Sequence, residues 1–500
     1  MRKVPIARSR FALEYRAIMS ADRKELESAF RQLPGVDEAL RLGRVARIAA
    51  KTGRSEVASL VRRALEGLRR EIAEGKLDAA GLAEQLGADE VATRVEALFS
   101  ADRKLGLQRV INVSGVVLNT GLGRAPVHLE VASRMAMAAA SFCVLEVERA
   151  SGKRNQRDDH LSRLLSRLTG CEAAIAVNNN AAAVFLCLQT FGQGGEAIVS
   201  RGELVEIGGS FRVPDVMVRA GVDLVEVGTT NRTRKADYSN AITPRTGLLM
   251  KVHTSNFKVI GFTEELSMQG LADLGSESGL PTVFDLGSGL FEQEGLEPLG
   301  KLGDETVVHD AVASGIDVVS FSGDKLFGGP QAGLIVGKRE HIERLRKNPI
   351  YRALRLDKST LCGLEGTLQL ILDGRGDEIP TRRMLRLTAD ELKPVAEALA
   401  QRIDALPGFE AEACADQSQP GSGSAPDVFL DTWVVRVQSS EYSVEALARR
   451  LRMGEPSVFA RVQSDRLLCD PRTLLHGDED GLLEAFKSLA TESSENSTGS

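Results

Sequence analysis

The spacing of apolar positions changes along the chain and divides it into regions. Within residues 1–76, apolar residues recur three and four positions apart, as in VARIAAKTGRSEVASLVRRALEGL, which predicts amphipathic helices. Pro34-Gly35 and Gly53 interrupt this pattern, so we expect several short helices in a small N-terminal domain. Residues 77–105 are predicted to be a helical linker that connects this domain to the rest of the chain.

Residues 106–380 alternate short β-rich runs with helical segments such as HLSRLLSRLTG and AAAVFLCLQTFG. Seven apolar runs bounded by Gly, Asn or Asp are typical of buried strands: EAAIAVNN, EAIVSRG, DLVEVG, GLLMKVHTS, PTVFDLG, DVVSFSG and AGLIVGK. This alternation predicts an α/β domain with a mostly parallel sheet and helices on both faces. Ligands bind such sheets beyond the carboxyl ends of the strands, so the loops that follow strands are the places to seek chemistry.

Residues 381–490 are predicted to form a small α+β domain. ADQSQPGSGSAPD (415–427) predicts a flexible loop. It is followed by the strand patterns WVVRVQ, VFARVQ and RLLCD and the helical patterns VEALARRLR and GLLEAFKSLA. The polar segment TESSENSTGS (491–500) predicts a disordered tail.

The composition agrees with this picture and excludes several classes of protein. Hydrophobic residues make up 43% and charged residues 26% of the chain, as in ordinary globular proteins. No run approaches about 18 apolar residues, and no apolar run of signal-peptide type follows the basic N-terminus. We therefore expect a cytoplasmic protein without a membrane span. The six cysteines are scattered without a CxxC pair, which favours reduced, mostly buried thiols over a metal site.

The distribution of charge adds a candidate partner. The net charge of −6 argues against nucleic acid in general and against DNA in particular, yet residues 1–50 hold 11 Lys and Arg against 6 Asp and Glu. A basic head on an acidic body indicates that a polyanion docks at the N-terminal domain. A solvated helical face would account equally well for the same charges.

The run DVVSFSGDKLFGGPQAGLIVGK places a lysine directly after a predicted buried strand. Burying Lys325 is costly unless its charge is used or removed, and a Schiff base with a carbonyl cofactor would remove it. Ser322 and the neighbouring main-chain N–H groups are suited to a cofactor phosphate. Taken alone, however, this SGDK turn is better explained by an exposed turn lysine.

Two further segments favour pyridoxal phosphate (PLP) as the cofactor. PTVFDLGSG places Asp285 at a strand end, where a carboxylate suits the protonated pyridine nitrogen. AIAVNNNAAAVFLCL places Asn179, Asn180 and the N–H groups that open a helix at Ala181 where they would cradle a phosphate, although such asparagines are usually plain helix caps. The order of phosphate loop, strand-end aspartate and lysine is typical of a fold-type I PLP-dependent transferase.

Nine segments of the chain, in order, resemble the bacterial selenocysteine synthase family, the L-seryl-tRNA(Sec) selenium transferases. The segments span most of the chain, and the helical head and small C-terminal domain also correspond. They are INVSGVVLNTGLGRAP (111–126), SGKRNQRDDHLSRLL (151–165), VNNNAAAVFL (177–186), RGELVEIGGSFRVPDVM (201–217), VGTTNRT (227–233), KVHTSNFKVIGFT (251–263), FDLGSG (284–289), SFSGDKLFGGPQAG (320–333) and YRALRLDK (351–358).

The resemblance implies roles for the residues at matching positions. Lys325 would hold PLP as a Schiff base, and Asp285 would pair with the pyridine nitrogen. Arg124, Arg352 and Arg355 would receive the anionic selenium donor, because guanidinium groups match phosphate-like oxygens. For Arg352 and Arg355, an exposed basic helix face is the alternative.

The resemblance also implies that Thr229, Thr230 and Asp324 belong to the active site. The chain departs from the family where LHTNLGRAP is usual, because Asn119 and Gly121 replace the histidine and the asparagine. This removes any catalytic duty of that histidine. His253 lies in a matching segment, but a structural role is at least as plausible for it.

The family function follows as an expectation. The enzyme would convert L-seryl-tRNA(Sec) to L-selenocysteinyl-tRNA(Sec) with selenophosphate as donor, by β-elimination through an aminoacrylyl-tRNA intermediate. Residues 1–76 would bind the tRNA, and the resemblance implies a homodecamer. The alternatives are a PLP lyase acting on a free small amino acid or amino sugar, and a non-enzymatic RNA-binding relative. The helical head discriminates against the lyase, because the related lyases lack it.

Overall fold

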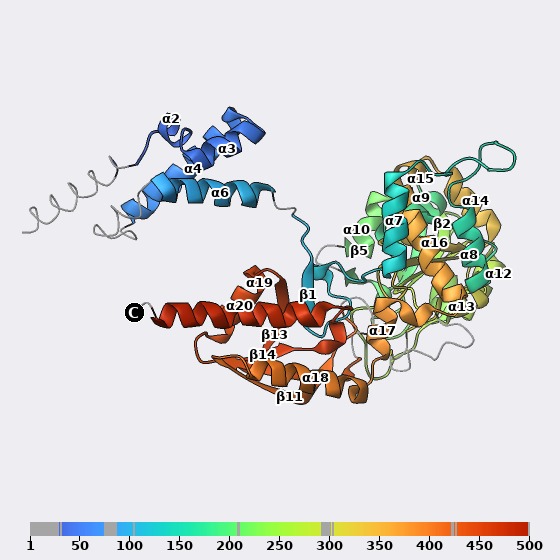
Figure 1. Ribbon diagram of the computed structural model, residues 1–500. Helices are drawn as coiled ribbons and strands as arrows, with labels where there is room; N and C mark the ends of the chain where they lie inside the picture. Colours follow the sequence, from blue (N-terminus) through green and yellow to red (C-terminus); the bar gives the residue numbers. More distant parts are fainter. Residues whose placement is uncertain are drawn as a thin grey trace, which may run out of the picture. The chain divides into compact units, whose positions relative to one another are not determined.

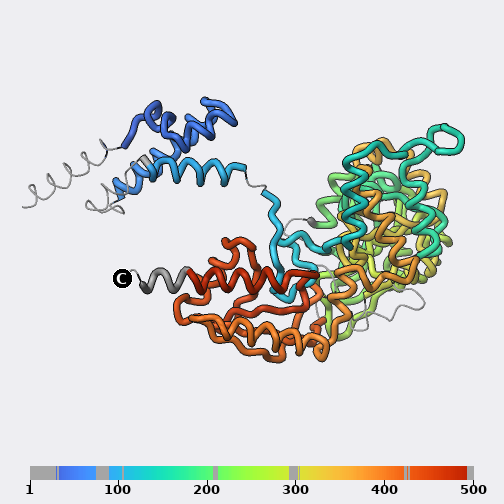
Figure 2. The backbone as a smooth tube through the Cα atoms, viewed as in Figure 1, coloured from blue at the N-terminus to red at the C-terminus, as the bar shows by residue number. Residues whose placement is uncertain are grey.

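The computed structural model describes residues 30, 33–74, 88–103, 106–207, 211–291, 302, 305–421, 425 and 428–498. It divides into two compact units, Met1–Gln108 and Arg109–Ser500. Figure 1 shows the elements of both units, and Figure 2 traces the backbone through them.

The first unit is a helical domain with its own apolar core. Its helices are α2 (Val36–Ala39), α3 (Gly43–Thr52), α4 (Arg54–Ala73) and α6 (Ala88–Arg103). Gly53, with φ of 102°, separates α3 from α4 as the sequence predicts. α6 lies in the segment predicted to be a linker, but its Val91, Ala92 and Val95 are buried in the same core as α4. Because α6 shares this core, it belongs to the helical domain. Residues 77–87, 104 and 105 of the predicted linker lie outside the described residues.

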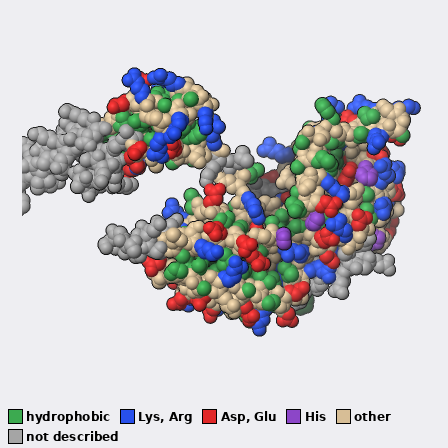
Figure 3. Space-filling model, in the orientation of Figure 1, with side chains coloured by type: hydrophobic (Ala, Val, Ile, Leu, Met, Phe, Trp, Pro, Cys, Tyr) green, Lys and Arg blue, Asp and Glu red, His purple; other side chains and the backbone are tan. Residues whose placement is uncertain are grey.

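Much of the basic charge described in this unit is paired with acidic side chains. Arg44 lies 2.5 Å from Glu96, and Arg94 lies 2.7 Å from Glu71. Residues 1–29, which hold the beginning of the basic head, lie outside the described residues. Figure 3 shows Lys and Arg side chains on the helical unit, and acidic and basic side chains interspersed on the visible face of the second unit.

A seven-stranded sheet organises the second unit, in the order β2-β10-β9-β8-β7-β3-β6. β10 is antiparallel to both of its neighbours, and the other strands run parallel to one another. The seven predicted strands are therefore confirmed, as is a mostly parallel sheet. Their bounds are β2 Ala173–Val177, β3 Glu196–Ser200, β6 Asp223–Val227, β7 Thr246–Val252, β8 Thr282–Gly287, β9 Val318–Ser322 and β10 Gly333–Gly337.

Helices cover both faces of this sheet. Successive residues of a strand point to opposite faces and therefore contribute to two different cores. On β8, Val283 joins one core and Phe284 the other. The helices on the Val283 side are α9 (Asn180–Gly192), α10 (Val213–Arg219), α14 (Arg339–Lys347) and α15 (Pro349–Leu354). The helices on the Phe284 side are α7 (Leu129–Ala140), α8 (Asp159–Thr169), α11 (Lys235–Ala241), α12 (Met268–Ser278), α13 (Val308–Ala313) and α16 (Lys358–Leu372).

A second sheet, in the order β1-β13-β14-β12-β11, forms the C-terminal part. β1 (Val110–Val113) pairs in parallel with β13 (Ser457–Gln463), and Ile111 and Val113 are buried in this core. The strand that begins the predicted 106–380 domain therefore belongs to the C-terminal sheet. The remaining elements are β14 (Arg466–Cys469), β12 (Leu430–Ser439), β11 (Phe409–Ser418), α18 (Ala389–Asp404), α19 (Val444–Met453) and α20 (Asp478–Thr498).

Two predicted irregular segments are partly regular. β11 continues to Ser418, so the first four residues of the predicted 415–427 loop form strand pairs with β12. α20 continues to Thr498, through most of the predicted disordered tail. Phe486 and Leu489 anchor this helix in the core, and lengthening an existing helix needs no new nucleation.

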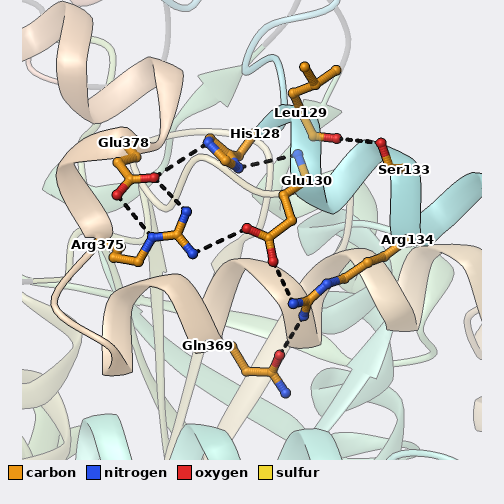
Figure 4. Close-up of polar contacts among 8 residues, drawn as sticks. All are labelled: His128, Leu129, Glu130, Ser133, Arg134, Gln369, Arg375 and Glu378. Atoms are coloured by element: carbon orange, nitrogen blue, oxygen red, sulfur yellow. Dashed lines mark hydrogen bonds and ion pairs between the residues drawn. The ribbon is translucent and has the colours of Figure 1, made fainter.

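A network of charged side chains fixes the start of α7 against α16 and the 3-10 turn Gly376–Glu378 (Figure 4). Glu130 accepts hydrogen bonds from Arg134 and from Arg375, the latter at 3.1 Å. Arg134 also donates to Gln369 on α16 at 2.7 Å. α7 begins five residues after Arg124, so the network steadies the helix that follows this predicted site residue.

Several further features bear on the predicted class of protein. Within the described ranges, no helix is both long and apolar enough to cross a membrane. All six cysteines are free thiols, of which Cys171, Cys187 and Cys469 are buried. Among the residues that the structure describes, no group of three or more His, Cys, Asp or Glu is arranged to hold a metal ion.

Candidate active site

The central feature of the site is a buried lysine beside a buried aspartate. β8 and β9 are parallel neighbours, and Asp285 pairs with Ser320 in their register. The register shifts between Asp285 and Gly287, which has a φ of 76°, and Lys325 follows three residues beyond the end of β9. Asp285 is 4% exposed and Lys325 6% exposed. The structure therefore brings these two predicted residues to the same edge of the sheet, and the predicted alternative of an exposed turn lysine is wrong.

Burial disfavours the charged forms of both groups. It lowers the pKa of the Lys325 amine, although the charge of Asp285 opposes the shift. It also raises the pKa of Asp285, against the opposing effects of the Asn180 hydrogen bond and of Lys325. A neutral amine is the nucleophilic form of lysine, and a buried carboxylate is stabilised by a cationic ligand group. The pair is thus electrostatically suited to a ligand with an electrophilic carbon and a protonated nitrogen.

The N-terminus of α9 lies beside this pair. Asn179 caps the helix, because its side-chain oxygen accepts a hydrogen bond from Ala182 N at 2.9 Å. The first N–H groups of a helix, here those of Asn180 and Ala181, have no intrahelical acceptor and favour an anion. Asn180 Nδ2 donates to Asp285 Oδ1 at 2.7 Å. Asn180 therefore contacts the predicted pyridine partner directly, a contact that the sequence alone did not indicate.

Glycine at position 333 permits this close approach between β10 and α9. A Cβ atom at Gly333 would lie 2.1 Å from Asn179 O and 2.9 Å from Asn180 N, closer than real contacts allow. Ser322, which pairs with Gly333 across the β9–β10 ladder, is 7% exposed. The predicted phosphate-binding residues Asn179, Asn180 and Ser322 are thus gathered around one glycine.

An ion pair joins two further predicted residues next to the lysine. Arg124 donates to Asp324 Oδ2 at 2.8 Å, and Asp324 is 7% exposed. Arg124 has φ of 62°, a left-handed conformation that is uncommon outside glycine. The turn before it is closed by Asn119, whose oxygen atoms accept from Gly121 N at 3.0 Å and from Arg124 N at 2.9 Å. Asn119, which departs from the family pattern, therefore shapes the turn that presents Arg124.

The other two predicted arginines lie near the end of α15. Arg355 donates to Glu146 at 3.1 Å, and Arg157 donates to the same carboxylate. Arg355 forms an isolated bridge with Val177, which lies two residues before Asn179. This places its backbone beside the strand that leads into α9. Arg352 is exposed in the last turn of α15, as expected for the alternative of a basic helix face.

Thr229 and Thr230 line a cavity of about 530 Å³ beside the carboxyl ends of β3, β6, β7 and β8. Thr229 Oγ1 donates to Arg232 O at 3.1 Å and closes the loop after β6. The side chains of both threonines are exposed to the cavity and to solvent. The cavity is large enough for a small organic ligand.

The ion pairs of Lys251 in this cavity and the partner of His253 were not identified from the sequence. Lys251 Nζ lies 2.8 Å from buried Glu203 and 3.1 Å from Glu265. His253 Nε2 lies 3.4 Å from Glu305 Oε2. A charged residue inside an apolar strand run, such as Lys251 in GLLMKVHTS, was the available signal for the first group.

These residues fit PLP. The helix N-terminus suits its phosphate, buried Asp285 suits its protonated ring nitrogen, and the Lys325 amine suits its aldehyde carbon. Asn180 Oδ1 is also buried without a hydrogen-bond partner among the described residues, as expected where a polar ligand completes a site.

Comparison with known proteins identifies the family of the chain. A family model described as L-seryl-tRNA selenium transferase matches residues 110–475, and one described as selenocysteine synthase N terminal matches residues 30–69. The L-seryl-tRNA(Sec) selenium transferase of Aquifex aeolicus is 44% identical over 454 residues, which are 91% of this chain and 97% of the relative. That of Geobacter sulfurreducens is 44% identical over 466 residues, 92% of this chain and 99% of the relative.

The fold is also found among solved structures. D-glucosaminate-6-phosphate ammonia-lyase superposes with a TM-score of 0.53 at 23% identity, over 77% of this chain and 97% of that chain. This likeness concerns the fold alone. The family match covers both units of the chain, and the chain belongs to the L-seryl-tRNA selenium transferase family.

Proposed function

We propose that this enzyme converts L-seryl-tRNA(Sec) into L-selenocysteinyl-tRNA(Sec), with PLP as cofactor and selenophosphate as the selenium donor. The observation that carries the proposal is the buried Lys325–Asp285 pair beside the N-terminus of α9. It occurs in a chain 44% identical to a named L-seryl-tRNA(Sec) selenium transferase over 91% of its length. A cytoplasmic location agrees with a tRNA substrate.

The residues around the cofactor have distinct tasks. When bound, PLP withdraws electrons from the α-carbon of the attached amino acid. Lys325 would hold its aldehyde carbon, Asp285 its ring nitrogen, and Ser322 with the first N–H groups of α9 its phosphate. Asn180 donates a hydrogen bond to Asp285. This bond stabilises the ionised carboxylate and so opposes the rise in the pKa of Asp285 that burial causes.

Lys325 also moves the first proton. Its amine would remove the proton from the seryl α-carbon. A neutral amine is required for this step, and burial favours that form. Loss of the β-hydroxyl then leaves the aminoacrylyl group on the tRNA, and selenium adds to its β-carbon.

Arginines would receive the selenium donor. Arg124 is held by Asp324 beside Lys325, and its Nε is buried without a hydrogen-bond partner among the described residues. Such a donor suits an oxygen of selenophosphate. Arg352 and Arg355 would complete the anion site once Arg355 leaves Glu146. Thr229 and Thr230 would orient the substrate through their hydroxyl groups.

The helical unit would bind the tRNA body. The seven-stranded sheet with its helices would form the catalytic domain, and the C-terminal sheet, which includes β1, would form an accessory domain. Arg41, Arg47 and Lys51 are exposed on or beside α3 and would contact phosphates. Replacing Arg47 and Lys51 by glutamate should raise the KM for seryl-tRNA and reduce its salt dependence. An unchanged KM would remove α3 from the tRNA-binding surface.

We also propose a homodecamer. Sedimentation or light scattering should then give ten times the 53.8 kDa mass of one chain. A mass of one or two chains under assay conditions would refute this assembly.

The decisive test is a turnover assay with seryl-tRNA(Sec), selenophosphate and PLP-loaded enzyme. The wild type should form selenocysteinyl-tRNA, and Lys325→Ala should not. Lys347→Ala, a change at an exposed lysine on α14, is the matched control and should retain activity. Selenocysteinyl-tRNA formed by Lys325→Ala would overturn the assignment, and activity on free serine instead of seryl-tRNA would favour a lyase.

A further inference from the structure

A histidine that has no role in the proposed function lies beside Asp285. His253 is the first residue after β7, and Val252 pairs with Asp285 in the β7–β8 register. The His253 N–H donates to Asp285 O at 2.9 Å. His253 therefore lies at the end of β7, next to Asp285, the predicted partner of the pyridine nitrogen. It lines the same cavity as Thr229 and Thr230.

Glu305 holds this imidazole from a buried position. The Glu305 side chain is 3% exposed, and its Oε2 lies 3.4 Å from His253 Nε2. Its Oε1 accepts a hydrogen bond from Ala425 N at 2.7 Å. A buried carboxylate requires a cation or several hydrogen bonds, and the His253 imidazole faces Glu305 Oε2. Glu305 thus orients the ring, as carboxylates do for other catalytic histidines.

The neighbouring ionisable groups of the cavity are engaged elsewhere. Lys251 is held by Glu203 and Glu265, and it also donates to Leu266 O at 3.1 Å. Glu264 pairs with Arg234 at 3.0 Å. Imidazole is the commonest general acid in enzymes, whereas threonine hydroxyls do not serve as acids near neutral pH. In the described lining, His253 is therefore the group best suited to donate a proton.

We propose that His253, oriented by Glu305, is the general acid for departure of the seryl β-hydroxyl; this inference rests on the proposed function. In this step the Cβ–O bond breaks, and its electron pair stays on the oxygen. That oxygen takes a proton from the imidazolium and leaves as water. The α-proton goes to Lys325, and the electron pair of the Cα–H bond forms the new Cα–Cβ double bond. Neutral His253 is then reprotonated from solvent.

The leaving group provides the test. His253→Gln should slow turnover of seryl-tRNA(Sec) by about 100-fold or more, the usual contribution of general acid catalysis. A substrate whose leaving group needs no proton, 3-chloroalanyl-tRNA(Sec), should keep most of its turnover with this variant. Exchange of the α-hydrogen with deuterated water should also persist, because Lys325 performs it. Titration of the variant with PLP, followed by absorbance, should give wild-type affinity.

Two further variants complete the experiment. Glu305→Gln should produce the same selectivity for the leaving group, and the double variant should be no slower than His253→Gln, because the two residues act as one unit. His309→Gln changes an exposed histidine on α13 and should leave both substrates unaffected. Equal losses with hydroxyl and chloride leaving groups, or no loss with either, would overturn the proposal. Wild-type turnover of seryl-tRNA in the same assay tests the proposed function separately.

Discussion

Replacing Asn180 by alanine would test how far the Asp285 carboxylate depends on its neighbour. Asn180 Nδ2 lies 2.7 Å from Asp285 Oδ1, and Asp285 is 4% exposed. Burial raises the pKa of Asp285, and the hydrogen bond from Asn180 opposes that shift. Without Asn180, the ionised carboxylate that should hold the cofactor nitrogen becomes less favourable.

The size of the effect follows from the type of bond. A hydrogen bond to a charged group contributes about 1.5–3 kcal/mol. The dissociation constant of PLP should therefore rise by roughly 10- to 100-fold in Asn180→Ala. Asn180→Asp should bind PLP still more weakly, because it places a second carboxylate beside the first.

The assay is a titration of apoprotein with PLP, followed by absorbance of the lysine-bound cofactor, together with thermal melting. Ser443→Ala removes the cap of α19 in the C-terminal part, where Ser443 accepts from Ala446 N at 3.3 Å. This control should lose about 1 kcal/mol of stability without losing PLP affinity. Wild-type PLP affinity in Asn180→Ala would refute the reasoning that this bond maintains the cofactor site.

Three further predictions concern other parts of the site. Gly333→Ala should lower unfolding free energy by about 1–3 kcal/mol or more in urea titrations, because its Cβ would meet Asn179 O; wild-type stability would contradict this close approach of β10 to α9. In the apoprotein, the pKa of Asp285 is raised, so above the ordinary aspartate pKa the folded chain binds more protons than the unfolded chain. The free energy of unfolding should therefore fall as the pH rises through the raised pKa. Asp285→Asn should flatten this part of a plot of melting temperature against pH. Glu146→Gln should lower the KM for selenophosphate by up to about fivefold, the value of a partly exposed ion pair, because it releases Arg355; a higher KM would mean that Glu146 positions the guanidinium instead of competing for it.

The apolar pattern by itself determined the strands of the main sheet and the order of the predicted site residues along the chain. Each of the seven runs of the main sheet is a local feature, because burial on both faces demands continuous apolar residues. The positions of Lys325 and Asp285 at strand ends followed from the same runs. Their nearness was also expected, since parallel strands end at one edge of the sheet.

Contacts between distant segments were decided only by the tertiary structure. Asn180 and Asp285 are separated by 105 positions, and Arg124 and Asp324 by 200. No local pattern records such pairs, because each depends on which strand ends become neighbours and on how loops pack above them. For the same reason β1 belongs to the C-terminal sheet, although α7, the next α-helix along the chain, packs against the seven-stranded sheet. The pairing of His253 with Glu305, which are 52 positions apart, likewise exists only in the folded chain.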